Sequence, residues 1–164
     1  ATLAGMAMFD VFARIQDGGV TNSYHWTEGA AATGSVDFNA NGSYDVSITV
    51  NNLGTENCPS SYCGSTFDQL MNKGPIGSIT WSATQSATHK NPHFETAQTG
   101  GVRVSTRNVN GGPAAGGFTV YEYKAMSGSL YGTANHVEVG AQLEFTRQNI
   151  NEMIMLRGTA VLSE

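Results

Sequence analysis

The sequence predicts an all-β protein: an antiparallel up-and-down β-barrel of roughly eight to ten strands, forming one domain over residues 1–164. Apolar and polar side chains alternate in many short segments, which is the period of a half-buried strand. Turn-forming residues, including 20 glycines, separate these segments. No long segment with a helical period lies between them, so a parallel sheet with crossover helices is disfavoured.

The first segments of the chain predict two strands and a hairpin. Ala7 to Ile15 alternates in polarity and predicts a strand that ends at Gly18-Gly19. Residues 20–28 predict a second, weaker strand. A hairpin follows over residues 33–50, and Asn41-Gly42 favours a two-residue type I′ turn because both turn positions need a positive φ.

A loop with two cysteines follows this hairpin. Cys58 and Cys63 bracket a segment bent by Pro and Gly, so we expect a local disulfide, with a pair of free thiols as the alternative. No further zinc ligand lies in the segment, so a metal site is not expected there. One short helix is predicted over residues 65–73, and Gly74-Pro75 ends it.

The second half of the chain returns to the strand period. A Gly- and Asn-rich loop is predicted over residues 108–117. The predicted strands lie around residues 79–81, 102–106, 118–122, 126–132, 137–145 and 154–162.

Residues 127–141 read Ser-Gly-Ser-Leu-Tyr-Gly-Thr-Ala-Asn-His-Val-Glu-Val-Gly-Ala. This segment resembles the Gly-x-Phe-Tyr-Gly-Pro-x-Ala-x-Glu-Val-Gly-Gly signature of transferrin-binding-protein-like β-barrels. The closing Arg157-Gly158-Thr159-Ala160-Val161-Leu162 is similar to the final strand of this group of barrels, so the resemblance lies mainly in residues 127–162. That group includes barrels of bacterial surface lipoproteins, factor H-binding-protein relatives and haemophore-like secreted proteins. Thr133 stands where the family has Pro, and Ala141 replaces a Gly. The resemblance implies a secreted protein, or an outer-membrane-lipoprotein-like one, that is extracellular, on the cell surface or periplasmic.

The same segment has a physical interpretation of its own. Gly132 and Gly140 are expected to permit tight backbone, one at a turn and one at a kink in the sheet. Leu130 and Tyr131 are expected to fill the barrel between them. An ordinary β-turn-β unit of any barrel or sandwich is the alternative.

Charge and motifs argue against several classes of function. The formal net charge is −5 and the basic residues are scattered, so no nucleic-acid partner is expected. No apolar run reaches the ~20 residues of a transmembrane helix. No nucleophile, metalloprotease or phosphate-loop motif occurs, so no catalytic residues are assigned and an enzyme is the least favoured class.

His89 and His93 are the one close pair of histidines. In a loop, histidines at this spacing suit a metal ion or haem iron, although solvated histidines are the default interpretation. The sequence requires no metal and no cofactor; haem is the one cofactor that this pair would suit.

The sequence therefore favours a barrel that binds a host protein, haem or another small ligand through its loops. The alternative is a structural subunit of an extracellular filament, sheath or other assembly. In that alternative, an unpaired first strand over Ala7 to Ile15 would add to the sheet edge of a neighbouring copy.

Overall fold

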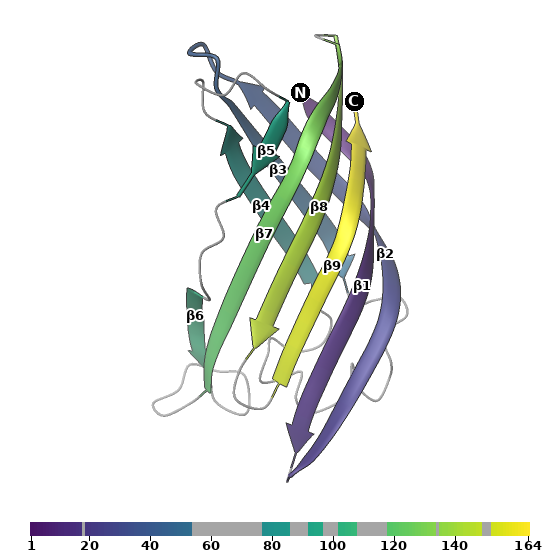
Figure 1. Cartoon of the computed structure of the whole chain (residues 1–164), viewed down its shortest axis with the longest axis vertical. Helices are drawn as coiled ribbons and strands as arrows, with labels where there is room; N and C mark the ends of the chain where they lie inside the picture. Colours follow the sequence, from purple (N-terminus) through teal and green to yellow (C-terminus); the bar gives the residue numbers. More distant parts are fainter. Residues whose placement is uncertain are drawn as a thin grey trace.

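The period-two alternation continues through the chain, and the described residues form nine strands of one antiparallel sheet (Figure 1). The structure is a computed structural model that describes residues 1–17, 19–53, 77–85, 92–96, 102–107, 118–133, 135–148 and 152–164. The strands are β1 (Thr2–Asp17), β2 (Val20–Phe38), β3 (Tyr44–Leu53), β4 (Gly77–Gln85), β5 (His93–Glu95), β6 (Val102–Arg107), β7 (Phe118–Thr133), β8 (His136–Gln148) and β9 (Glu152–Ser163).

The strand order is that of an up-and-down barrel. Neighbours in the sheet follow the order β4-β3-β2-β1-β9-β8-β7-β5, and β6 also pairs with β7. β1 pairs with β2 on one side and with β9 on the other, which joins the two ends of the chain. The predicted all-β antiparallel barrel is therefore confirmed. A strand of 19 residues such as β2 is about 60 Å long, so the barrel is elongated.

The barrel is nearly closed, and side-chain hydrogen bonds connect β3 and β4 on one side of the gap with β5 and β7 on the other. β4 lies at one end of the strand order and β5 at the other. The Gln85 Nε2 and the Tyr44 hydroxyl both donate to the backbone carbonyl of His93, at 2.6 and 3.3 Å. The Lys124 Nζ donates to the carbonyl of Thr80 at 2.9 Å. These contacts hold the edges together where no backbone ladder between them is described.

Apolar side chains fill the interior of the barrel. Phe9 and Trp81 stack there with their ring centroids 6.2 Å apart. The indole N–H of Trp81 donates to the carbonyl of Glu144 at 2.9 Å, so the one polar atom of this ring is satisfied. The largest fully buried apolar side chains are Leu3, Ile48, Leu53, Trp81, Phe94, Met126, Leu143, Phe145, Ile154, Leu156 and Leu162.

Among the residues whose burial is described, two charged side chains are also buried, and no sequence pattern indicates either of them. Glu28 is only 1% exposed, and the Trp26 indole nitrogen donates to its Oε2 at 3.4 Å. Arg147 reaches Glu122 through Nη2 at 2.6 Å and Nε at 2.8 Å, and its guanidinium lies 5.2 Å from the centroid of the Phe145 ring. A buried charge is tolerated when it is paired in this way.

The predicted hairpin over residues 33–50 is confirmed, but the predicted type of turn is wrong. Phe38 pairs with Tyr44, so five residues connect the two strands instead of two. Gly42 has a φ of 87°, and its N–H donates to the carbonyl of Asn39 at 2.9 Å. Asn41 has no positive φ, whereas a type I′ turn needs one at both central residues.

Several strands are longer than predicted. The segment 20–28 and the first arm of the hairpin are one continuous strand, β2, and the segments 118–122 and 126–132 are both parts of β7. The first strand is paired along both sides, so the idea that it donates a free edge to a neighbour is wrong for this fold.

Other predictions lie outside the described residues. These are the helix over 65–73, the loop over 108–117 and the disulfide between Cys58 and Cys63. In the described part of the chain, no helix is long and apolar enough to span a lipid bilayer.

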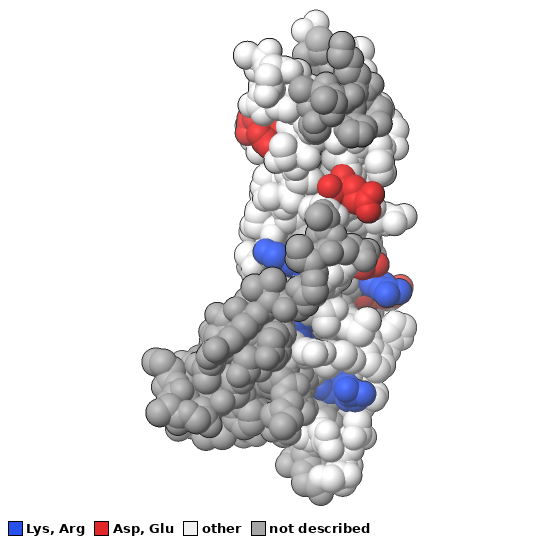
Figure 2. All heavy atoms as spheres, turned by 60° about the vertical axis from the view of Figure 1, so that its left-hand side comes forward, with Lys and Arg blue, Asp and Glu red and all other residues white. Residues whose placement is uncertain are grey.

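Charged side chains are sparse on the face shown in Figure 2, where white surface separates most of them. Asp and Glu lie in the upper and middle parts of this view, in the middle next to Lys or Arg, and Lys and Arg lie in its middle and lower parts. The prediction that no nucleic acid is a partner remains a prediction.

Candidate functional site

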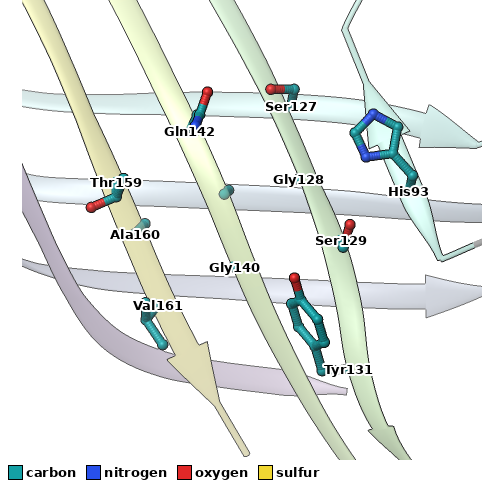
Figure 3. A pocket seen from close by; sticks show the side chains of 11 residues that line it. His93, Ser127, Gly128, Ser129, Tyr131, Gly140, Gln142, Thr159, Ala160 and Val161 are labelled. Atoms are coloured by element: carbon teal, nitrogen blue, oxygen red, sulfur yellow. The ribbon is translucent and has the colours of Figure 1, made fainter.

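A shallow groove lies on the outer surface of the barrel, across β7, β8 and β9 (Figure 3). Its volume is about 430 Å³, within the range of small-ligand sites. Gly140 lies between Ser129 of β7 and Val161 of β9 in the register of the sheet. Because Gly140 has no side chain, it leaves a hollow between these two neighbours. The residues that line it are His93, Ser127, Gly128, Ser129, Tyr131, Gly140, Ala141, Gln142, Thr159, Ala160 and Val161.

Tyr131 forms the aromatic part of this groove. Successive side chains of a strand point to opposite faces, so Leu130 packs against the core while Tyr131 lies outside. The ring leans over Gly140, where an added Cβ would lie 3.4 Å from the Tyr131 Cε2. The residue is nevertheless 59% exposed. It therefore offers an aromatic surface to a ligand instead of filling the barrel.

Uncharged polar side chains surround the aromatic ring. Ser127 lies opposite Gln142, and Gln142 lies opposite Thr159, so the three form a row across the outer face. Ser129 stands in the next row, beside Gly140. No hydrogen bond is described between any of these side chains and another described residue of the chain. Their donors and acceptors therefore face solvent and are available to a ligand.

A second, smaller hollow borders the groove. Its volume is about 220 Å³, and it shares Ser127 and Gln142 with the groove. It also contains two carboxylates, those of Glu95 and Glu144. The Glu144 carboxylate lies 3.7 Å from the Arg157 guanidinium, and Glu95 lies opposite Ser127 in the row that the two hollows share.

The histidine pair is only half described. His93 opens β5, so it lies in a strand and not in the predicted loop, and it lines the margin of the groove (Figure 3). His89 lies outside the described residues. Among the described residues, no group of three or more His, Cys, Asp or Glu is placed to hold a metal ion. Ligation of haem iron by this pair remains a prediction.

The glycines of the 127–141 motif have different roles. Gly132 has a φ of 102°, and an added Cβ would collide with the backbone carbonyl of His136, which fits the predicted turn. Gly140 meets no backbone atom, so its role is to leave space under Tyr131 and not to permit a kink. The expectation that Tyr131 fills the barrel is wrong, because its neighbour Leu130 occupies the inward position.

Two titratable groups near the β2–β3 turn have shifted pKa values. Hydrogen bonds from Thr84 and then from Asn39 lower the pKa of the Asp45 carboxyl below its ordinary value. Burial raises the pKa of the Tyr44 phenol. Neither residue lines the groove. These pKa shifts therefore reflect the hydrogen bonds and burial near the β2–β3 turn and not the chemistry of the groove.

The 127–141 motif contains six of the eleven residues that line the groove, but it does not predict a groove. Gln142, Thr159 and Val161 occur in ordinary alternating strands, and none belongs to a motif with a known chemistry. The usable signal was the strand period, which places every second residue of each strand on the outside. It does not tell which outer positions of different strands become neighbours.

The comparisons with known proteins give no match: no protein family, no curated protein and no solved structure matches this chain. The likeness to transferrin-binding-protein-like barrels therefore stays a prediction.

Proposed function

We propose that this chain is an exported or cell-surface β-barrel whose function is to bind a host protein, haem or another small ligand. Export is supported by the sequence resemblance and by the closely spaced pair Cys58 and Cys63, which suits an oxidising compartment. Most of the segments that were expected to bind are not described. The described residues favour the outer surface of β7 to β9 as the binding surface.

The observation that carries the proposal is the groove at Gly140. An exposed Tyr131 stands beside hydroxyl and amide groups that make no described hydrogen bond within the chain. Strands with a packed core hold these groups in place, so little conformational entropy is lost when a ligand binds. A rigid aromatic anchor next to free polar groups is typical of binding surfaces.

The test is a binding screen of the purified chain against haem, serum proteins and small molecules. Haem binding is read from the visible absorption band, protein binding from surface plasmon resonance and retained small molecules from native mass spectrometry. We expect at least one ligand, and we expect Tyr131→Ala to weaken it. Phe38→Ala is the matched control, because Phe38 is a similarly exposed aromatic residue outside the groove, 63% against 59%.

Two results would contradict this proposal. One is a chain that binds none of these ligands. The other is a ligand whose affinity falls equally in Tyr131→Ala and Phe38→Ala, because the groove would then have no special part in binding.

One observation favours the alternative function, a structural subunit of an extracellular assembly. Met6 and Met8 of β1 are both more than half exposed, and Val161 of β9 lies directly opposite Met6. Exposed apolar side chains that are neighbours in a sheet are typical of contact surfaces. Sizing and electron microscopy at high protein concentration test this alternative, and a strictly monomeric particle would exclude it.

A further inference from the structure

Few charged side chains lie at the groove. None of the described residues that line it is Asp, Glu, Lys or Arg, although His93 lines its margin. Two carboxylates flank it, because Glu95 lies opposite Ser127 and Glu138 lies opposite Tyr131. An anionic ligand would lose hydration here and would face these carboxylates, which is unfavourable. Carboxylates accept hydrogen bonds from hydroxyl groups, so the surroundings fit a neutral ligand that carries hydroxyls.

The polar side chains of the groove stand in regular rows across neighbouring strands. Neighbouring strands are about 4.8 Å apart, and alternate residues of one strand are about 6.8 Å apart. Ser127, Gln142 and Thr159 thus present donors and acceptors at regular intervals along one row, with Ser129 in the next. The surface from Ser127 to Tyr131 and across to β9 measures about 14 by 10 Å. A ligand that uses it needs many hydroxyl or amide groups at short spacing.

The aromatic ring adds a second requirement. Tyr131 is 59% exposed, and Val161, which lines the same groove, is 67% exposed. An apolar ligand would leave the surrounding hydroxyls unpaired, while a purely polar one would leave the ring and Val161 in water. A ring with C–H groups on its faces and hydroxyls around its rim can contact the apolar side chains and form hydrogen bonds with the polar ones. This is the chemistry of a sugar.

An extended peptide fits the groove less well. Peptides that bind sheets usually add a strand to a free edge, where backbone groups are unpaired. The groove lies on a face instead, where β8 pairs with β7 and β9 along its length. Its floor therefore has few free backbone groups for a peptide to use.

We infer that the ligand of this groove is a short, neutral oligosaccharide, an inference that rests on the proposed binding function at the same site. The sugar ring stacks on Tyr131 over Gly140, and its hydroxyls replace water on Ser127, Ser129, Gln142 and Thr159. Which sugar units bind depends on which of their hydroxyls can form hydrogen bonds with these four side chains.

The experiment is an amide NMR titration of the full chain with cellotetraose, chitotetraose, maltotetraose and a mannose tetramer. A sulfated heparin tetrasaccharide and an uncharged peptide are the comparison ligands. We expect shifts for at least one neutral oligosaccharide, concentrated at residues 127–131, 140–142 and 159–161. Tyr131→Ala should weaken binding at least about tenfold. Gly140→Val fills the groove from its floor and should weaken binding to a similar degree.

Phe38→Ala is the control and should leave the affinity unchanged within about twofold. If haem, a protein, the peptide or the sulfated sugar binds at the groove and no neutral oligosaccharide does, the inference is overturned while the binding function stands. If nothing binds at all, both fail. Shifts that map to another surface, or that survive both groove variants, also overturn the inference.

Discussion

Replacing Leu162 by alanine should lower the free energy of unfolding by about 3 kcal/mol, whereas the same change at its neighbour Val161 should cost less than about 0.5 kcal/mol. Leu162 is 1% exposed and Val161 is 67% exposed, although they are consecutive residues of β9. Inside the barrel, Leu162 reaches β2: an added Cβ on Gly34 would lie 3.2 Å from its Cδ2.

The magnitude follows from the atoms that are removed. Leu→Ala deletes about three carbons at ~0.8 kcal/mol each, or ~2.4 kcal/mol of transfer free energy. The cavity left beside Gly34 adds to this value, since measured Leu→Ala changes in cores start near ~2.7 kcal/mol. For a chain of this size, about 3 kcal/mol corresponds to a fall in Tm of about 6–12 °C.

Urea denaturation followed by far-UV circular dichroism measures both variants. The pair is a test of register, because a slip of one residue in β9 would exchange the inner and outer faces. If Val161→Ala lowers the free energy of unfolding more than Leu162→Ala does, the described register of β9 is wrong. Val161 would then point into the barrel, and the groove would lose its place on the outer surface.

Three further predictions concern single contacts. Trp81→Phe keeps an aromatic ring in the core but leaves the carbonyl of Glu144 without its indole donor, so urea denaturation should show a loss of about 1–3 kcal/mol. Gly132→Ala should destabilise the β7–β8 turn by a similar amount, about 1–3 kcal/mol, because its φ of 102° is strained for any residue with a Cβ. In an NMR titration, the pKa of Asp45 should lie below the ordinary value, and Thr84→Val, which removes the largest cause of that shift, should raise it. Since the folded pKa is the lower one, the stabilising contribution of Asp45 is present above its unfolded pKa and is lost as the pH falls through the folded pKa; an unchanged pKa in Thr84→Val would contradict this.

The strand period explains why much of the fold was predictable. Tyr44, Val46, Ile48 and Val50 alternate with polar residues, and all four are buried in β3 as expected. Turn chemistry was less informative. Asn41-Gly42 marks the position of the turn correctly, but the number of connecting residues depends on how Phe38 and Tyr44 pair.

The candidate site was harder to predict than the fold. The 127–141 motif drew attention to Tyr131 and Gly140, yet it suggested that the tyrosine fills the barrel. The structure places the ring outside, over the glycine. Thr159 and Val161 join the groove from β9, and no pattern near residue 131 indicates them.

By itself, the sequence determined the antiparallel β class and which side chains of most strands face inward, because alternation is a local property of one strand. Only the tertiary structure decided that β1 pairs with β9, that Gly140 lies between Ser129 and Val161, and that a groove opens there. The register between strands depends on closing the whole sheet at once, so each cross-strand neighbour is fixed by the packing of all the others.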